Sequence, residues 1–324
     1  MKKQVSLLLL LVFFSGVLLA QEAVAKGPEL YFVSDTQQPL FVEKLLLKPN
    51  HNRAATAGIF AAIQKNKPQS LYMLGDIVGL GSSRRKWKKV DAFLDNCRKD
   101  GTSVCGLLGN HEVMVSRKRG ERFFQQRFPM NVSTGYIDVT DSVAVIMLNS
   151  NFTALSAADE NKQQQWYSST LAVLDTTAAV KAIIVCCHHA PFTNSNIVQC
   201  NTTVQQQFVP GYIASRKAQL FITGHAHAFE HFNVQGKDFL VIGGGGGLHQ
   251  PLGSGEGRLN DLAIDYKPMF HYLSVKRVDN NLVVLSHFLK TDFSGFDKGI
   301  GFNTRIAGDN LAAMPDMNAV KKGN

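Results

Sequence analysis

Five short apolar runs recur along the chain, and polar side chains with metal-binding chemistry follow each of them. The runs are "ELYFVS", "SLYMLG", "SVCGLLG", "AIIVCC" and "QLFITG". The residues that follow them are Asp35; Asp76; Asn110 with His111; His188 with His189; and His225 with His227. Short continuous apolar runs bounded by glycine and polar residues are typical of strands buried on both faces. The pattern therefore predicts five buried strands that each deliver polar residues at one end.

Segments with helical periodicity separate these runs, near residues 53–65, 84–99 and 162–176. Alternation of strands with helices predicts a layered α/β sheet, in which ligands bind where the strands end. A later segment, residues 270–289, alternates between apolar and polar positions on both sides of residues 279–281, and this pattern predicts a β-hairpin.

The polar residues at the strand ends form one set of ligands if the strand ends share one edge. Two carboxylates, one amide oxygen and at least three imidazoles suit two metal ions such as Fe, Zn or Mn better than one structural zinc ion. For "GNHE" alone, at residues 109–112, a turn with solvent-exposed side chains is the simpler interpretation. Independent turns at all five strand ends would require five coincidences, so we expect Asn110 to leave its strand to bind a metal ion.

The order of these motifs resembles that of the calcineurin-like metallophosphoesterases, over roughly residues 29–290. The motifs are D-x-Q, GD, GNHE, H-x-P and GHxH, and the segments "HHAPFTNS" and "GHAHAFEHF" are similar to those of plant-type purple acid phosphatases. The resemblance implies a four-layer αββα sandwich of two mixed sheets, with a dinuclear metal centre at the strand ends.

Carried over position by position, the resemblance also implies two metal sites that share one carboxylate. The implied ligands are Asp76 as the bridge between the ions, Asp35 and His227 in one site, and Asn110, His189 and His225 in the other. Because His189 stands two residues before Pro191, as the family pattern requires, we expect His188 to support the ligands and not to bind a metal ion itself.

The chain departs from the family pattern at two positions. Gln37 stands where the first motif more commonly has histidine, so its amide oxygen would bind the first metal ion weakly or leave that ion with an extra water. Gly79 stands where purple acid phosphatases have a tyrosine ligand. Without a phenolate ligand there is no charge-transfer colour, which makes this protein a relative of the purple enzymes and not one of them.

A centre of this kind hydrolyses phosphate esters, because two metal ions acidify a bridging water and stabilise in-line displacement at phosphorus. His111 is predicted to contact the phosphoryl group or protonate the leaving oxygen, and Glu112 to orient the His111 ring. We expect an acid-phosphatase-like phosphomonoesterase. A phosphodiesterase acting on nucleotides, glycerophosphodiesters or lipid head groups is the alternative, and a metal-poor binding protein with a site decayed at Gln37 is the alternative of another class.

The first 25 residues combine Lys2 and Lys3 with an apolar run and the sequence "AVA", a pattern typical of a secretory signal peptide. The expected organisation is therefore a signal peptide at 1–25, a phosphoesterase domain at 26–298 and an irregular tail at 299–324. Secretion or export to the periplasm follows, with membrane contact only through the signal peptide; an uncleaved N-terminal anchor is the alternative.

The formal net charge is +9, and the densest basic patch is "RRKWKK" at residues 84–89. We interpret this patch as the solvated face of a helix, with steering of anionic substrates as a secondary role. No nucleic-acid motif accompanies it, so nucleic acid is not an expected partner. The sequence leaves the oligomeric state open.

Five cysteines and a run of five glycines complete the unusual features. Cys186 and Cys187 lie in an apolar run and are expected in the core, whereas Cys97, Cys105 and Cys200 could supply one disulfide, of which Cys97–Cys105 is the simplest. The glycines at 243–247 favour a turn crowded by the metal site over a backbone that approaches a phosphate, and they do not match a nucleotide-binding P-loop.

Overall fold

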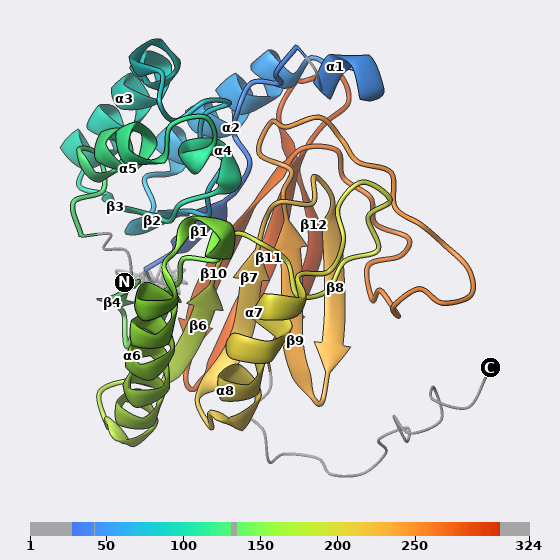
Figure 1. Cartoon of the computed structure of the whole chain (residues 1–324). Helices are drawn as coiled ribbons and strands as arrows, with labels where there is room; N and C mark the ends of the chain where they lie inside the picture. The colour runs from blue at the N-terminus through green and yellow to red at the C-terminus, as the bar shows by residue number, and fades with distance from the viewer. Residues whose placement is uncertain (1–27, 42, 131–134, 305–324) are drawn as a thin grey trace, which may run out of the picture.

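Two six-stranded mixed sheets form the centre of the protein (Figure 1), in a computed structural model that describes residues 28–41, 43–130 and 135–304. In spatial order, the first sheet contains β12 (Phe296–Asn303), β11 (Asn281–Leu289), β10 (His271–Val278), β1 (Leu30–Val33), β2 (Ser70–Met73) and β3 (Ser103–Gly106). The second contains β4 (Tyr136–Thr140), β5 (Val143–Met147), β6 (Ala182–Cys186), β7 (Ala218–Thr223), β9 (Lys237–Ile242) and β8 (Phe229–Val234).

Helices cover the outer face of each sheet. The helices are α1 (Glu43–Leu46), α2 (Asn52–Asn66), α3 (Arg84–Lys99), α4 (Asn110–Val113), α5 (Arg117–Gln125), the 3-10 helix η1 (Phe152–Ala154), α6 (Ala157–Thr176), α7 (Thr202–Gln207) and α8 (Val209–Ala214). Buried side chains of α2, α3 and α5 pack on the first sheet, and those of α6 and α8 pack on the second. A third apolar cluster lies between the two sheets. The predicted four-layer αββα sandwich is thereby confirmed.

The strand register brings the predicted site residues to one edge. In the first sheet the parallel strands β1, β2 and β3 end level with one another, because Val33 pairs with Met73 and Met73 pairs with Gly106. In the second sheet Met147 pairs with Cys186, which in turn pairs with Ile222. Side chains that follow these strands therefore emerge at the same level, as the sequence pattern required.

The predicted helices and the hairpin are present, with one difference in length. β10 and β11 pair antiparallel and close at Val278 and Asn281, which confirms the hairpin. α6 begins five residues earlier than its apolar periodicity indicated. Ser156 caps it by accepting a hydrogen bond from the Asp159 backbone N–H at 3.1 Å, and Glu160 adds a second acidic residue to the first turn. Capping and helix-dipole effects stabilise a turn that contributes few apolar residues.

The C-terminal boundary expected at residue 298 is wrong, because β12 continues to Asn303. Residues 299–303 are not an irregular tail: Phe302 pairs with Val284, and Asn303 pairs with Val283. The expected signal peptide and residues 305–324 lie outside the described residues. Among the residues that are described, no helix has both the length and the apolar character needed to cross a membrane.

All five cysteines are free thiols, so the Cys97–Cys105 disulfide does not form. Cys97 on α3 packs in the apolar cluster outside the first sheet, whereas Cys105 on β3 packs against the cluster between the sheets. The two thiols therefore lie on opposite faces of one sheet. Cys186 and Cys187 are fully buried, as expected.

Candidate metal centre

Three of the predicted ligands have a strained backbone conformation. Asp35, Asp76 and His225 each follow the end of a strand and adopt left-handed φ values of 59°, 48° and 67°. Residues other than glycine rarely adopt this conformation, which costs on the order of 1–3 kcal/mol per residue and is found mainly at functional sites. The three turns point the side chains away from their own strands and toward the edge shared by the two sheets.

Glycines next to the predicted ligands leave space that these ligands fill. A Cβ on Gly109 would lie 2.2 Å from Asp76 Oδ1, and a Cβ on Gly224 would lie 2.4 Å from Asp35 Oδ2. A Cβ on Gly75 would lie 2.8 Å from the ring of His188. Each glycine is therefore required for the close approach of a site residue.

Asp35, Gln37 and His227 form one side of the site. Asp35 Oδ1 lies 3.3 Å from His227 Nε2, and the other ring nitrogen, Nδ1, bonds to the Leu248 carbonyl at 2.6 Å. In the orientation that satisfies its hydrogen bonds, the Gln37 amide nitrogen donates to the backbone carbonyls of Asp35 and Asp76, at 2.9 and 2.8 Å. The amide oxygen of Gln37 then faces His227 Nε2 at 3.2 Å. Gln37 thus directs an oxygen toward His227, and the expectation that this oxygen binds a metal ion weakly stays a prediction.

His188 occupies the middle of the site. Its Nδ1 bonds to the Leu74 carbonyl at 2.9 Å, and its Nε2 lies 3.3 Å from Asp76 Oδ2 and 3.1 Å from Asn110 Oδ1. The ring belongs to two clusters whose ligand atoms lie within 4.8 Å of one another: Asp35, Asp76 and His188, and His188, His189 and His225. A histidine held by a backbone carbonyl through one nitrogen, with the other nitrogen directed at carboxylates, has the geometry of a metal ligand. His188 is therefore a possible ligand and not only a support for the other ligands, and its binding of a metal ion stays a prediction.

His189 and His225 form the second side of the site with Asn110. The ring centroids of His189 and His225 are 4.5 Å apart. His189 Nδ1 bonds to the Ser150 hydroxyl at 2.8 Å, which fixes the direction of its other nitrogen. The His225 backbone N–H donates to Asp35 Oδ2 at 2.9 Å, so this side is tied to the first.

Glu112 does not have the role predicted for it. All of its acceptor capacity is directed to backbone: Oε2 accepts from the N–H groups of Asp76 and Gly109 at 2.8 and 2.9 Å, and Oε1 accepts from those of Ile77 and Val78 at 2.9 and 3.2 Å. The fully buried carboxylate therefore shapes the loop that carries Asp76 and does not orient the His111 ring. Sequence adjacency suggested a side-chain pair, but the helical turn of α4 directs the two side chains apart.

His111 is oriented by the backbone of the same loop. Its Nδ1 bonds to the Gly79 carbonyl at 3.1 Å, and its Nε2 lies 3.8 Å from Asp76 Oδ2. The His111 backbone N–H donates to Asp76 Oδ1 at 2.8 Å. Gly79, where a tyrosine ligand was noted as missing, has no room for a side chain, because a Cβ there would lie 2.6 Å from the Gln38 carbonyl oxygen.

The five glycines at 243–247 form a turn packed against the site. Gly245 N–H donates to the Ser34 carbonyl and Gly247 N–H to the Asp35 carbonyl, both at 2.9 Å. A Cβ on Gly247 would lie 2.4 Å from the His227 ring. The expected crowding of this turn by the metal site is confirmed.

The donor set fits metal ions. Asp35 Oδ1 is buried and makes no hydrogen bond; the imidazole of His227, 3.3 Å away, is its charge partner, and a metal ion at this point would stabilise the carboxylate further. Carboxylate, amide and imidazole donors converge from both sheets, and they match the ligands preferred by Zn, Fe and Mn. Asp35, Asp76, Asn110, His189, His225 and His227 come together as predicted, and the assignment of each to one ion stays a prediction.

Burial and neighbouring charges shift the pKa values of several site residues. Burial alone would raise the pKa of Asp76, but His188, His111 and His225 hold it well below its usual value. Burial lowers and Asp76 raises the pKa of His188, to a net value of about 10. Burial and the neighbouring His188 lower the pKa of His189 to about 3. The carboxylates therefore recruit a proton onto His188, and a metal ion at the site would compete with that proton.

An open cavity of about 530 Å³ borders the second side of the site. Its lining includes Asn110, His189, Ser150 and Arg117. Neither Ser150 nor Arg117 was predicted from the sequence. Ser150 had a signal of the same kind as the predicted ligands, because the apolar run of β5 also ends in polar residues, "NSN" at 149–151. Arg117 had none, because it is one of several basic residues in α5.

The family of calcineurin-like phosphoesterases matches this chain over residues 29–229. The chain belongs to this family. The expectation of a metal-dependent phosphoric ester hydrolase is thereby confirmed. A comparison with curated protein sequences finds no match.

Solved structures share the fold at low sequence identity. Purple acid phosphatase PPD1 from yellow lupin (Lupinus luteus) seeds has a TM-score of 0.62 and 13% identity, over 85% of this chain and 53% of its own. The phosphoesterase therefore spans about half the length of that enzyme. GAP50, the anchor in the inner membrane complex of Plasmodium, has a TM-score of 0.61 and 12% identity, over 86% and 89%. A dimetal phosphatase from Danio rerio has a TM-score of 0.51 and 12% identity, over 87% and 99%.

Proposed function

We propose that this phosphoesterase is an exported phosphomonoesterase that binds two metal ions of the Fe, Zn or Mn type. The observation that carries the proposal is the overlap of two clusters of possible ligands at His188, where the ends of both sheets meet. Family membership and the likeness to a purple acid phosphatase and a dimetal phosphatase support a phosphate ester as the substrate.

The two ions would share the ligands that the strand ends provide. Asp35, Gln37 and His227 would hold one ion, Asn110, His189 and His225 would hold the other, and Asp76 and His188 lie between these two groups. When bound, two such ions lower the pKa of water and neutralise charge on a phosphoryl group. The chain's own residues then have to bind, orient and protonate the substrate.

Arg117 and His111 are placed for these tasks. Arg117 lines the open cavity beside Asn110 and is held through its Nε by Glu121 at 2.8 Å. Its two terminal nitrogens can bind the oxygens of a phosphate group. The His111 ring is oriented by the Gly79 carbonyl, so its Nε2 faces Asp76 and can donate a proton to the leaving oxygen.

The test is hydrolysis by the purified protein after metal removal and reconstitution. Chelation should abolish activity on nitrophenyl phosphate, and added Fe, Zn or Mn should restore it. The phosphomonoesterase proposal requires a higher kcat/KM for nitrophenyl phosphate than for bis-nitrophenyl phosphate. The opposite preference would replace it with a phosphodiesterase. Inactivity on both substrates with every metal would overturn the enzymatic function.

Export is tested separately, because it rests only on the N-terminal sequence pattern. Mass spectrometry of the protein recovered from the medium or periplasm should give a mature chain that begins near residue 26. A cytoplasmic protein that retains Met1 would contradict export and leave the proposed chemistry unaffected.

A further inference from the structure

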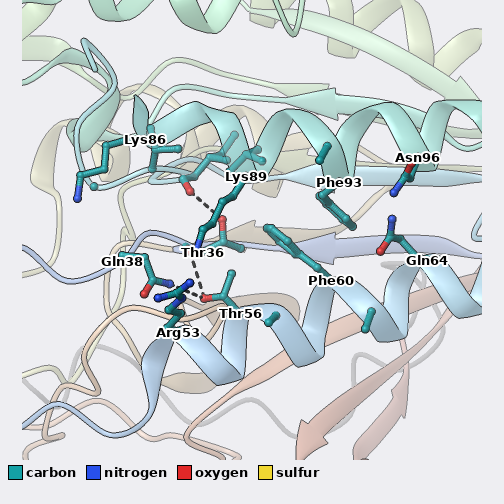
Figure 2. Close-up of a pocket in the computed structure, with 17 residues that line it drawn as sticks. Thr36, Gln38, Arg53, Thr56, Phe60, Gln64, Lys86, Lys89, Phe93 and Asn96 are labelled. Carbon is teal, nitrogen blue, oxygen red and sulfur yellow. Dashed lines mark hydrogen bonds between the residues drawn. The ribbon is translucent and has the colours of Figure 1, made fainter. Parts of the chain in front are cut away.

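A second cavity, of about 450 Å³, lies between α2 and α3 on the outer face of the first sheet (Figure 2). Its floor includes Thr36, Gln38 and Gly79, which belong to the loops that follow β1 and β2. None of the proposed metal ligands lines it. It is therefore a separate site from the metal centre, although both are built on the same two loops.

The two helices present matching side chains along this cavity. α2 and α3 each connect parallel neighbours of the sheet, so both run in the same direction. From the N-terminal to the C-terminal end, the matching residues are Arg53, Phe60 and Gln64 on α2, and Lys89, Phe93 and Asn96 on α3. The cavity thus has a cationic end, an aromatic middle and an amide end.

Three cations gather at the first end. Figure 2 shows Arg53, Lys86 and Lys89 on the side of the cavity where Gln38 and Thr56 lie. None of the three cations forms an ion pair within the described part of the chain. Like charges that share one end of a cavity without a carboxylate repel one another, and a bound anion would relieve the repulsion.

The middle of the cavity is aromatic. The rings of Phe60 and Phe93 are parallel, with an angle of 3° between their planes and 3.8 Å between centroids. Each ring covers one face of the other, so a further planar ring can stack only on a face that stays open. Phe60 is half-buried and therefore accessible to such a ring.

The far end carries two side-chain amides. Gln64 and Asn96 face each other from α2 and α3 in Figure 2. An amide offers both a donor and an acceptor, the combination that reads the edge of a nucleobase. A fatty-acyl chain would meet these polar groups at the end where its apolar tail should lie, so the lining disfavours a single-chain amphiphile.

We propose that this cavity binds a nucleoside monophosphate. The phosphate lies between Arg53, Lys86 and Lys89, the base stacks on the aromatic pair, and the edge of the base bonds to the two amides. The observations that carry this assignment are the order of the three chemistries along the helices and the unpaired charges at one end.

The test is calorimetric binding of the methylenephosphonate analogue of adenosine monophosphate, which cannot be hydrolysed, to the full-length protein. Lys89→Ala and Phe60→Ala should each weaken binding by about tenfold or more, the usual worth of a charged hydrogen bond or a stacked base. Arg85→Ala is the matched control, because Arg85 is exposed on the same helix and does not line the cavity. It should change affinity by less than about twofold, within the range of ordinary surface substitutions.

Further measurements distinguish binding in this cavity from binding at the metal centre. They also distinguish a nucleotide from ligands that carry no base. Asp76→Ala, which removes a proposed metal ligand, should leave nucleotide binding intact, and Lys89→Ala should leave kcat on nitrophenyl phosphate unchanged. Binding that disappears in Asp76→Ala and persists in Lys89→Ala would place the nucleotide at the metal centre and overturn the proposal. Equal or tighter binding of octyl phosphate or of inorganic phosphate would also overturn it, because neither carries a base.

Discussion

At the scale of single residues, the site uses one device repeatedly: a backbone group fixes one atom of a side chain and leaves another directed into the centre. His188 is held by the Leu74 carbonyl, and His227 is held by the Leu248 carbonyl. In each ring the other nitrogen faces a carboxylate, at 3.3 Å in both cases. Backbone anchors fix the orientation of the rings before any metal binds, which reduces the ordering cost of binding.

Substitutions of the neighbours Asn110 and His111 should affect metal content and turnover differently. Asn110→Ala removes an oxygen directed at His188 and should lower both metal content and rate, with partial recovery in excess metal. His111→Ala should keep its metal, because the bond to Asp76 comes from the His111 backbone N–H. Its turnover should fall by ~10²–10⁴-fold, the usual worth of a positioned general acid.

The measurement is metal stoichiometry beside kcat for a nitrophenyl phosphate and an alkyl phosphate in each variant. The deficit of His111→Ala should be smaller for the nitrophenyl ester, because nitrophenolate leaves without protonation. If His111→Ala loses metal as Asn110→Ala does, His111 is a ligand or a structural support. Equal deficits on both substrates would rule out the general-acid role.

Glu112→Gln should lower the stability of the folded protein. Glutamine has one acceptor oxygen, so the two backbone N–H groups bonded to the other carboxylate oxygen lose their acceptor. Each buried donor left unpaired costs about 1–3 kcal/mol. The free energy of unfolding, measured in denaturant, should fall by at least that amount. Unchanged stability with a large loss of kcat would restore the catalytic role that the sequence suggested.

At the scale of elements, the sequence predicted which strands carry the site but not how the loops between them are held. Apolar runs that end in polar residues identified β1, β2, β6 and β7 because each of these strands is buried on both faces. The same pattern identified β3, although β3 is only partly buried and its first residue, Ser103, is exposed. Three of the four contacts of Glu112 were not predictable, because these three partners lie 34 to 36 residues away in backbone N–H groups that leave no sequence signal. The register relative to Pro191 likewise favoured His189, and only the packing of β6 beside Leu74 brought His188 to the centre.

The glycine turn after β9 offers a test of element packing. Gly247→Ala should displace His227, because the new Cβ would lie 2.4 Å from its ring, and metal content should fall. Gly295→Ala is the matched control, because a Cβ there meets no atom within 4 Å. Elemental analysis of the two variants checks the prediction. Full metal content in Gly247→Ala would mean that His227 is not a ligand or that the turn relaxes freely.

At the scale of the whole molecule, the residue that follows β12 links the two sheets through hydrogen bonds. Thr304 follows this strand and bonds to Gln219 of β7, while its backbone N–H donates to Leu282 at 2.9 Å. Thr304, the last residue that the structure describes, therefore connects the first sheet to the second, and we call this connection the closure. The boundary expected at residue 298 would remove this closure.

Two truncated chains test that closure. A chain of residues 26–304 keeps every described residue of this contact and is the reference. A chain that ends at residue 298 should lose about 2 kcal/mol or more, because it exposes Val284 and the side of the sheet that Phe302 covers. Thermal unfolding measures both. Equal stability of the 298 and 304 chains would contradict a structural role for β12.

The proposed dinuclear metal centre requires ligands from both sheets, with Asp76 shared between the two ions. The most direct test is the number of metal ions bound per chain, measured by elemental analysis after reconstitution, in the wild-type protein and in Asp76→Ala, with Asp297→Ala as an exposed carboxylate control. We expect about two ions in the wild-type protein and in the control, and close to none in Asp76→Ala, because a shared ligand serves both ions. Retention of two ions in Asp76→Ala, or none in the wild-type protein, would contradict the proposed centre.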